Sequence, residues 1–133
     1  MRKPIITVLQ KVCDVTDNAR AEQSHGPTRL NDLGLSQIGL LESVSTHWRE
    51  KTSGGGPAIL DRDCTVAAYI QRPATWSRAQ LFPHRYLSNT NNPCWFGRLH
   101  VDPDDEILVY TINANATDFF LPVRLSVFQE VEI

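Results

Sequence analysis

The last fifteen residues of the chain, 119–133, carry the pattern that most constrains the fold. Successive side chains of a β-strand point to opposite faces, so an apolar side chain at every second position predicts a half-buried strand. Gln129 is the one polar residue on the apolar side, and Pro122 indicates either an edge strand or a strand that starts slightly later. A free edge here favours strand pairing between copies of the chain. The apolar positions are Leu121, Val123, Leu125, Val127, Val131 and Ile133.

Two shorter segments, 95–101 and 106–112, are rich in residues that favour strands. The turn sequence 102–105 separates them, and a short polar connection leads into 119–133. Connections this short favour antiparallel neighbours, so we expect a three-stranded β-meander. All aromatic residues except Trp48 and Tyr69 lie beyond residue 72, which marks this part as a separate aromatic-rich unit.

Apolar residues before residue 72 recur at helical spacing instead. The spacing predicts helices over about 5–17, 37–51 and 59–70, and a short helical turn at 77–82 follows. We interpret the polar stretch 19–28 as a loop. The expected fold is therefore α+β: a bundle of three to four helices in residues 1–72, then a small antiparallel sheet in residues 73–133. The sequence leaves open whether the two units share one core.

The approach to the second predicted helix is the segment that suggests a function. Leu30 and Leu33 are apolar anchors, Gly34 supplies a bend, and Ser36 stands where a helix N-cap belongs. This arrangement, followed by Ile38, Leu41 and Glu42, resembles the acyl or peptidyl carrier protein family.

The resemblance implies a helical bundle in which a serine at the start of the second helix carries a 4′-phosphopantetheine arm. A phosphate at that place meets unpaired amides and the positive end of the helix dipole. A one-residue shift of the alignment brings Ser36 to this position; the alternative is that Ser36 is a plain N-cap. The predicted helix 37–51 corresponds to the recognition helix of the family, although Glu42 and Glu50 are balanced there by His47, Arg49 and Lys51.

We therefore expect a non-catalytic, carrier-like binding or adaptor module without a cofactor, which docks onto a protein partner. One alternative is a functional carrier with the arm on Ser36. Another is a small enzyme that uses Cys94 or Cys64 with one of the four histidines. The candidate partner-binding residues are Gln37, Leu40, Glu42, Trp48, Trp76 and Trp95.

Composition and charge exclude several other functional classes. A net charge of −2 argues against nucleic-acid binding, and no apolar run reaches the length of a membrane span. Three scattered cysteines without ligand spacing argue against a zinc site or a disulfide framework. The first seven residues have a basic start but no sustained apolar region or cleavage site, so we expect a cytoplasmic protein. The carboxylates at 102–106 indicate a solvated hairpin turn rather than a site for a divalent cation. The oligomeric state and the identity of the partner are not fixed by the sequence.

Overall fold

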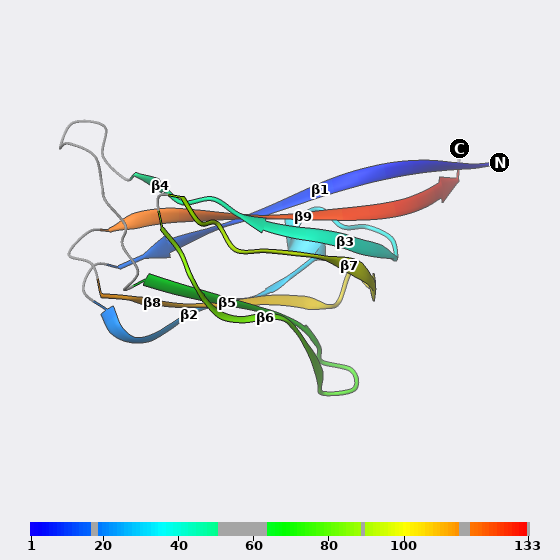
Figure 1. The fold of residues 1–133 in the computed structure, drawn as a ribbon. Helices are drawn as coiled ribbons and strands as arrows, with labels where there is room; N and C mark the ends of the chain where they lie inside the picture. Colours follow the sequence, from blue (N-terminus) through cyan, green and yellow to red (C-terminus); the bar gives the residue numbers. More distant parts are fainter. Residues whose placement is uncertain (17–18, 51–63, 89, 115–117, 133) are drawn as a thin grey trace.

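Strands in two layers make up the described part of the chain. The computed structural model describes residues 1–16, 19–50, 64–88, 90–114 and 118–132. These residues form nine β-strands and one 3₁₀ turn, η1 (Asn31–Leu33), and they contain no α-helix. In Figure 1 the strands lie in two stacked sheets.

Sheet A, the upper layer in Figure 1, has the strand order β1-β9-β3-β7, with the short β4 also paired to β9. β1 and β9 pair in an unbroken antiparallel register, from Arg2 opposite Glu132 to Val15 opposite Phe119. Figure 1 shows this two-stranded ribbon extending beyond the other strands, so the ends of the described chain lie together. The strands of sheet A are β1 (Arg2–Val15), β3 (Gly39–Thr46), β4 (Arg49–Glu50), β7 (Cys94–Val101) and β9 (Phe119–Glu132).

Sheet B, the lower layer, has the strand order β2-β8-β5-β6, and its neighbouring strands are also antiparallel. Its strands are β2 (Ala19–Arg29), β5 (Cys64–Arg72), β6 (Ser77–Tyr86) and β8 (Glu106–Asn113). The free edges are therefore β1 and β7 in sheet A, and β2 and β6 in sheet B.

Strand pairing is nested along the chain. β1 pairs with β9, β2 with β8, β3 with β7, and β5 with β6. The chain therefore forms one long antiparallel hairpin that folds over itself. The pairing of β3 with β9 then completes sheet A, and the pairing of β5 with β8 completes sheet B. Two sheets connected in this way define a jelly roll, an architecture shared by viral capsid, lectin and cupin domains. A fold shared so widely does not by itself define a function.

One hydrophobic core fills the space between the sheets. Its cluster draws residues from both sides of residue 72, including the fully buried rings of Phe82 and Phe119. Gln129 also lies on the inner side, where it is 4% exposed. Its side-chain oxygen accepts a hydrogen bond from the Thr7 hydroxyl at 2.6 Å, and its amide nitrogen donates to the Gln37 carbonyl at 2.9 Å. The side-chain amide of Gln129, the one polar residue on the apolar side of the strand, is thus hydrogen-bonded through both its oxygen and its nitrogen.

The predicted α+β fold and the helical unit at residues 1–72 are wrong. The resemblance to acyl or peptidyl carrier proteins fails with them, because that family is a helical bundle. The predicted helix 5–17 falls mainly in β1, 37–51 in β3 and β4, and the short turn at 77–82 in β6; the predicted loop 19–28 forms most of β2. The predicted helix 59–70 belongs to β5 from residue 64 onward, and 59–63 lie outside the described residues.

A β-bulge explains why β3 looked helical. Leu41 and Val44 are three residues apart, a helical spacing, yet both are fully buried in the core. The register of β3 with both neighbours shifts between Leu41 and Ser43, so one extra residue brings both side chains to the inner face. Gly34 does bend the chain as expected, with a φ of 112°, but it follows η1 and leads into a strand.

The three predicted strands are confirmed as β7, β8 and β9, with small changes at their ends. The predicted meander is wrong, because β8 belongs to sheet B whereas β7 and β9 belong to sheet A. β9 is also an inner strand, flanked by β1 and β3, and not the predicted edge.

Candidate functional site

The most distinctive surface of the described chain follows β1, a fourteen-residue strand at the free edge of sheet A. Its only strand partner in the sheet is β9. Long free edges are uncommon in isolated proteins, because their unpaired N–H and C=O groups invite another strand to pair.

The direction of the backbone groups of β1 follows from Pro122 in β9. The carbonyl of Pro122 accepts a hydrogen bond from the His47 N–H at 3.3 Å, so it points toward β3 and β4. The N–H and C=O of one strand residue point to the same side, so the backbone groups of its partner Val12 point away from β9. The register is unbroken, and the even-numbered residues of β1 therefore direct their backbone groups to the free edge.

The same geometry explains how Pro122 is tolerated in an inner strand. β3 ends at Thr46, opposite Val123, and β4 begins at Arg49, opposite Phe120. Pro122 lies opposite the break between them, where its missing N–H removes no ladder hydrogen bond. Pro4, on β1, likewise has its nitrogen at the free edge.

The even-numbered side chains of β1 point to the outer face of sheet A, and three of them are large and apolar. Ile6 is 56% exposed, Val8 59% and Val12 46%. The odd-numbered Leu9, Cys13 and Val15 are buried in the core. An antiparallel sheet that faces water on one side normally alternates apolar and polar residues. β1 is apolar on both faces, which indicates that its outer face is not adapted to water alone.

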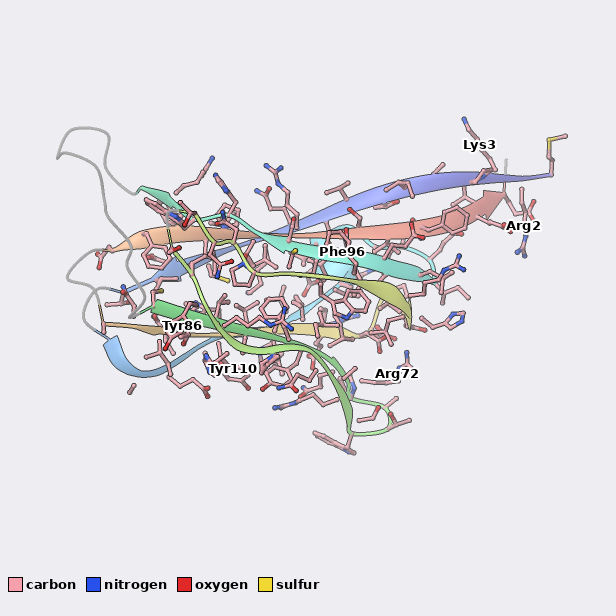
Figure 2. All side chains as sticks on the ribbon, in the orientation of Figure 1. Arg2, Lys3, Arg72, Tyr86, Phe96 and Tyr110 are labelled. Carbon is pink, nitrogen blue, oxygen red and sulfur yellow. The ribbon has the colours of Figure 1, made fainter. Side chains whose placement is uncertain are left out.

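This apolar character continues across the sheet. Cross-strand neighbours place Ile6, Phe128 and Leu40 in one row over β1, β9 and β3. The next row runs from Val8 through two serines to Phe96 on β7, which is 76% exposed. Phe96 is labelled on the upper sheet in Figure 2. We call Ile6, Val8, Val12, Leu40, Phe96 and Phe128 the outer apolar face.

Charged groups frame the β1 part of this face. Arg2 and Lys3 lie at the projecting end of the ribbon in Figure 2, and Arg2 makes a long contact of 3.4 Å with Glu132. Asp14 lies near the other end of β1. Lys11 points inward and donates to the Thr28 hydroxyl of β2 at 2.5 Å, which connects the two sheets on this side. The edge is therefore apolar at its centre, basic at one end and acidic at the other.

A second feature is a groove at the end of the sandwich where β5, β6 and β7 meet. A hollow of about 380 Å³ and a neighbouring one of about 260 Å³ share Arg72 and His100. Asp105, 2% exposed, accepts hydrogen bonds from Nε and Nη2 of Arg72, both at 3.1 Å. The hydrogen bond to Asp105 raises the pKa of Arg72 further above its ordinary value. Arg98 and His100 also line the smaller hollow.

The predicted turn at 102–106 is present, but it is not a solvated hairpin: it connects β7 of sheet A to β8 of sheet B, and Asp105 is buried. Its carboxylates make structural contacts. Asp105 also accepts from the N–H of Asp102 at 2.9 Å, and Asp104 bonds Arg29 at 2.7 Å. Glu106 accepts from the Gln71 amide at 2.9 Å. No group of three or more His, Cys, Asp or Glu within the described residues is arranged to hold a metal ion.

The cysteine candidates differ in accessibility. Cys64 and Cys13 are buried, and burial raises the pKa of the Cys13 thiol to about 12. Such a thiol is almost wholly protonated at neutral pH and is a poor nucleophile. Cys94 is half-buried on β7. None of the three cysteines is joined in a disulfide within the described residues.

The structure does not bring the residues predicted for partner binding together into one surface. Leu40 belongs to the outer apolar face. Trp48 packs edge-to-face on Phe119, with ring centroids 6.4 Å apart, and its indole N–H donates to the Ser88 carbonyl. Trp95 packs against the core, whereas Trp76 is 87% exposed at the tip of the β5–β6 turn. Gln37 is exposed before β3, and Glu42 is half-buried at the bulge of β3.

Ser36 is exposed in the coil between η1 and β3. It therefore lacks the helix N-terminus that made it a candidate for a phosphopantetheine arm. The sequence does not reveal β1 as a strand, because its apolar residues also fit one face of a helix. The usable signal was the β-branched content of Ile5, Ile6, Val8, Val12 and Val15, which favours a strand.

No protein-family model matches this sequence, and a comparison with curated proteins gives no significant match. Within the described residues, no helix has the length and apolar character needed to cross a membrane.

Proposed function

We propose that this chain is a non-catalytic association module that binds protein through β1 and the adjoining outer apolar face of sheet A. The observation that carries the proposal is the exposure of Ile6, Val8 and Val12 on β1, an edge strand that pairs with β9 alone among the described strands. Added strands of this kind gain affinity from main-chain hydrogen bonds and specificity from alternate side chains.

The proposal keeps the expected protein partner and changes the docking surface from a helix to a strand. No cofactor is part of it. A cytoplasmic location remains part of the proposal, since three free thiols suit a reducing compartment.

A comparative capture experiment tests this function. The bait is the tagged chain as wild type, as Ile6→Lys/Val8→Lys, or as Tyr86→Lys. Tyr86 is a matched control because it is 57% exposed on β6, the edge strand of the other sheet. We expect one set of proteins, untagged copies of the chain included, to bind wild type and Tyr86→Lys but not Ile6→Lys/Val8→Lys. Equal binding by all three baits would contradict the proposal.

A second candidate function is binding of a small anion in the 260 Å³ hollow. The observation that favours it is that Arg98 and His100 line this hollow together with the apolar residues Ile70, Ala79 and Leu99. Arg72 is already engaged by Asp105, so Arg98 is the guanidinium that remains for a ligand.

Titration with inorganic phosphate and with a short-chain fatty acid, followed by NMR shifts of β7 amides, tests this candidate. Arg98→Ala should abolish saturable shifts, and Arg78→Ala should leave them intact. Arg78 is a suitable control because it bonds Gln71 and lies over the Tyr69 ring instead. Shifts that do not saturate, or that survive Arg98→Ala, exclude the site.

A further inference from the structure

We propose that the protein bound by β1 is a second copy of this chain, paired antiparallel, β1 to β1, about a two-fold axis at Val8. The inference rests on the proposed function, because it names the partner of the same strand. A two-fold axis is the commonest symmetry of protein dimers, and it requires a surface that is complementary to itself.

The direction of the backbone groups limits the registers of such a pair. Even-numbered residues of β1 direct their N–H and C=O groups to the free edge, so an even residue must face an even residue of the partner. Their side chains then share one face, and the outer faces of the two sheets join. Registers in which the numbers of facing residues sum to 14, 16, 18 or 20 overlap along most of β1, Arg2–Val15.

Charge distinguishes these registers. A sum of 14 sets Lys3 opposite Lys11 of the other copy, and like charges directly opposite are destabilising. A sum of 16 sets Arg2 opposite Asp14 at both ends of the pair. Sums of 18 and 20 leave Arg2 beyond the end of the partner strand, and a sum of 18 sets Pro4 opposite Asp14. The register with a sum of 16 is therefore the one that pairs opposite charges, and it centres on Val8.

The apolar side chains fit this register but do not select it by themselves, because a sum of 14 pairs Ile6 with Val8 and a sum of 18 pairs Ile6 with Val12. Val8 of one copy packs against Val8 of the other. Pro4 faces Val12, where its missing N–H leaves one ladder hydrogen bond unmade at each end of the pair. Ile6 faces the aliphatic part of Gln10. The three most exposed apolar residues of β1 thus lie next to the axis or next to an apolar neighbour.

In this dimer the two copies of sheet A form one continuous sheet. The free edge of β1 disappears from both chains, which removes the tendency to pair with unrelated strands. The outer apolar faces become neighbours across the axis and extend to Phe96 on each side.

Cysteine cross-linking tests the partner and the register together. The background is Cys94→Ser, which leaves only the buried Cys13 and Cys64. Facing residues in a strand pair lie close enough for a disulfide, whereas Gln10 and its own copy are offset by four residues, roughly 13 Å. We expect Val8→Cys to cross-link with itself under mild oxidation and Gln10→Cys alone not to do so. A mixture of Ile6→Cys and Gln10→Cys should give the mixed dimer. Self-cross-linking of Gln10→Cys at the rate of Val8→Cys overturns the register.

Charge exchange gives an independent readout. We expect Arg2→Glu to raise the dimer dissociation constant three- to tenfold in sedimentation equilibrium, since both ends of the pair acquire like charges. The double variant Arg2→Glu/Asp14→Arg should return to within about twofold of wild type. Failure of the second change to restore dimerisation contradicts the pairing of Arg2 with Asp14.

The two proposals fail in different ways. A chain that stays monomeric at every concentration, yet captures another protein only when Ile6 and Val8 are intact, overturns the second-copy inference and leaves the association function standing. If Ile6→Lys/Val8→Lys captures the same partners as wild type, both proposals are overturned.

Discussion

Asp105 shows how a single side chain sets the shape of one end of the sandwich. It is buried, accepts two hydrogen bonds from Arg72 on β5, and caps the N–H of Asp102 in the β7–β8 turn. It thereby connects a strand to a turn that is distant in sequence. The cluster of acidic residues in the sequence showed that a turn was present, but it did not indicate which carboxylate is buried.

We expect Asp105→Asn to lower the free energy of unfolding by about 1–3 kcal/mol, because Arg72 loses its charged acceptor and the substituted amide presents donors toward it. Urea denaturation provides the measurement. Asp104→Asn is the control in the same turn, since its bond to Arg29 is exposed and should contribute no more than about 1 kcal/mol. Equal losses for the two variants would show that burial of Asp105 has no energetic role.

His25 makes stability depend on pH. Burial, followed by the nearby charge of Lys11, lowers the pKa of His25 below its ordinary value of 6.5. Its ring nitrogen Nε2 lies 2.7 Å from the hydroxyl of the buried Thr111. The unfolded chain therefore binds a proton more readily than the folded chain, so stability falls as the pH drops below about 6.5.

His25→Gln should reduce the loss of unfolding free energy between pH 7.5 and pH 5, since glutamine does not titrate in this range. Urea midpoints at several pH values measure the difference. An unchanged pH dependence in this variant would assign the effect to other groups.

At the scale of elements, the sequence predicted three of the nine strands, because β9 alternates cleanly and 95–101 and 106–112 are rich in strand formers. It failed for β1 and β3 for different reasons. β1 is apolar on both faces, so helical spacing can be found within it. In β3 a bulge places Leu41 and Val44 on one face at a helical distance. A bulge depends on pairing with β7 and β9, which no local pattern records.

Gly39, at the start of β3, is required by the close approach of β9. A Cβ at this position would lie 2.5 Å from Val127 Cγ1 and 2.7 Å from the Phe128 carbonyl oxygen. We expect Gly39→Ala to cost about 1–3 kcal/mol of unfolding free energy, because the backbone of β9 has to shift. Ser45→Ala, an exposed position on the same strand, should stay within about 0.5 kcal/mol. A stable Gly39→Ala variant would show that β3 and β9 lie further apart.

At the scale of the whole molecule, the fold depends on pairings that sequence reading does not reveal. β1 pairs with β9 although Arg2 and Glu132 lie at opposite ends of the described chain. The outer apolar face likewise combines residues from β1, β3, β7 and β9, and only the strand order makes them neighbours. Leu40 was the one predicted partner-binding residue on this face, and its assignment came from a helix that does not form.

Amide hydrogen exchange along β1, followed by NMR, tests the central claim most directly. The N–H groups of Ile5, Thr7, Leu9 and Lys11 point toward β9, whereas those of Ile6, Val8, Gln10 and Val12 point to the free edge. We expect both sets to be protected in the associated wild-type protein, and only the first set in Ile6→Lys/Val8→Lys. Edge-facing amides that exchange as fast in wild type as in this variant would contradict strand pairing at β1.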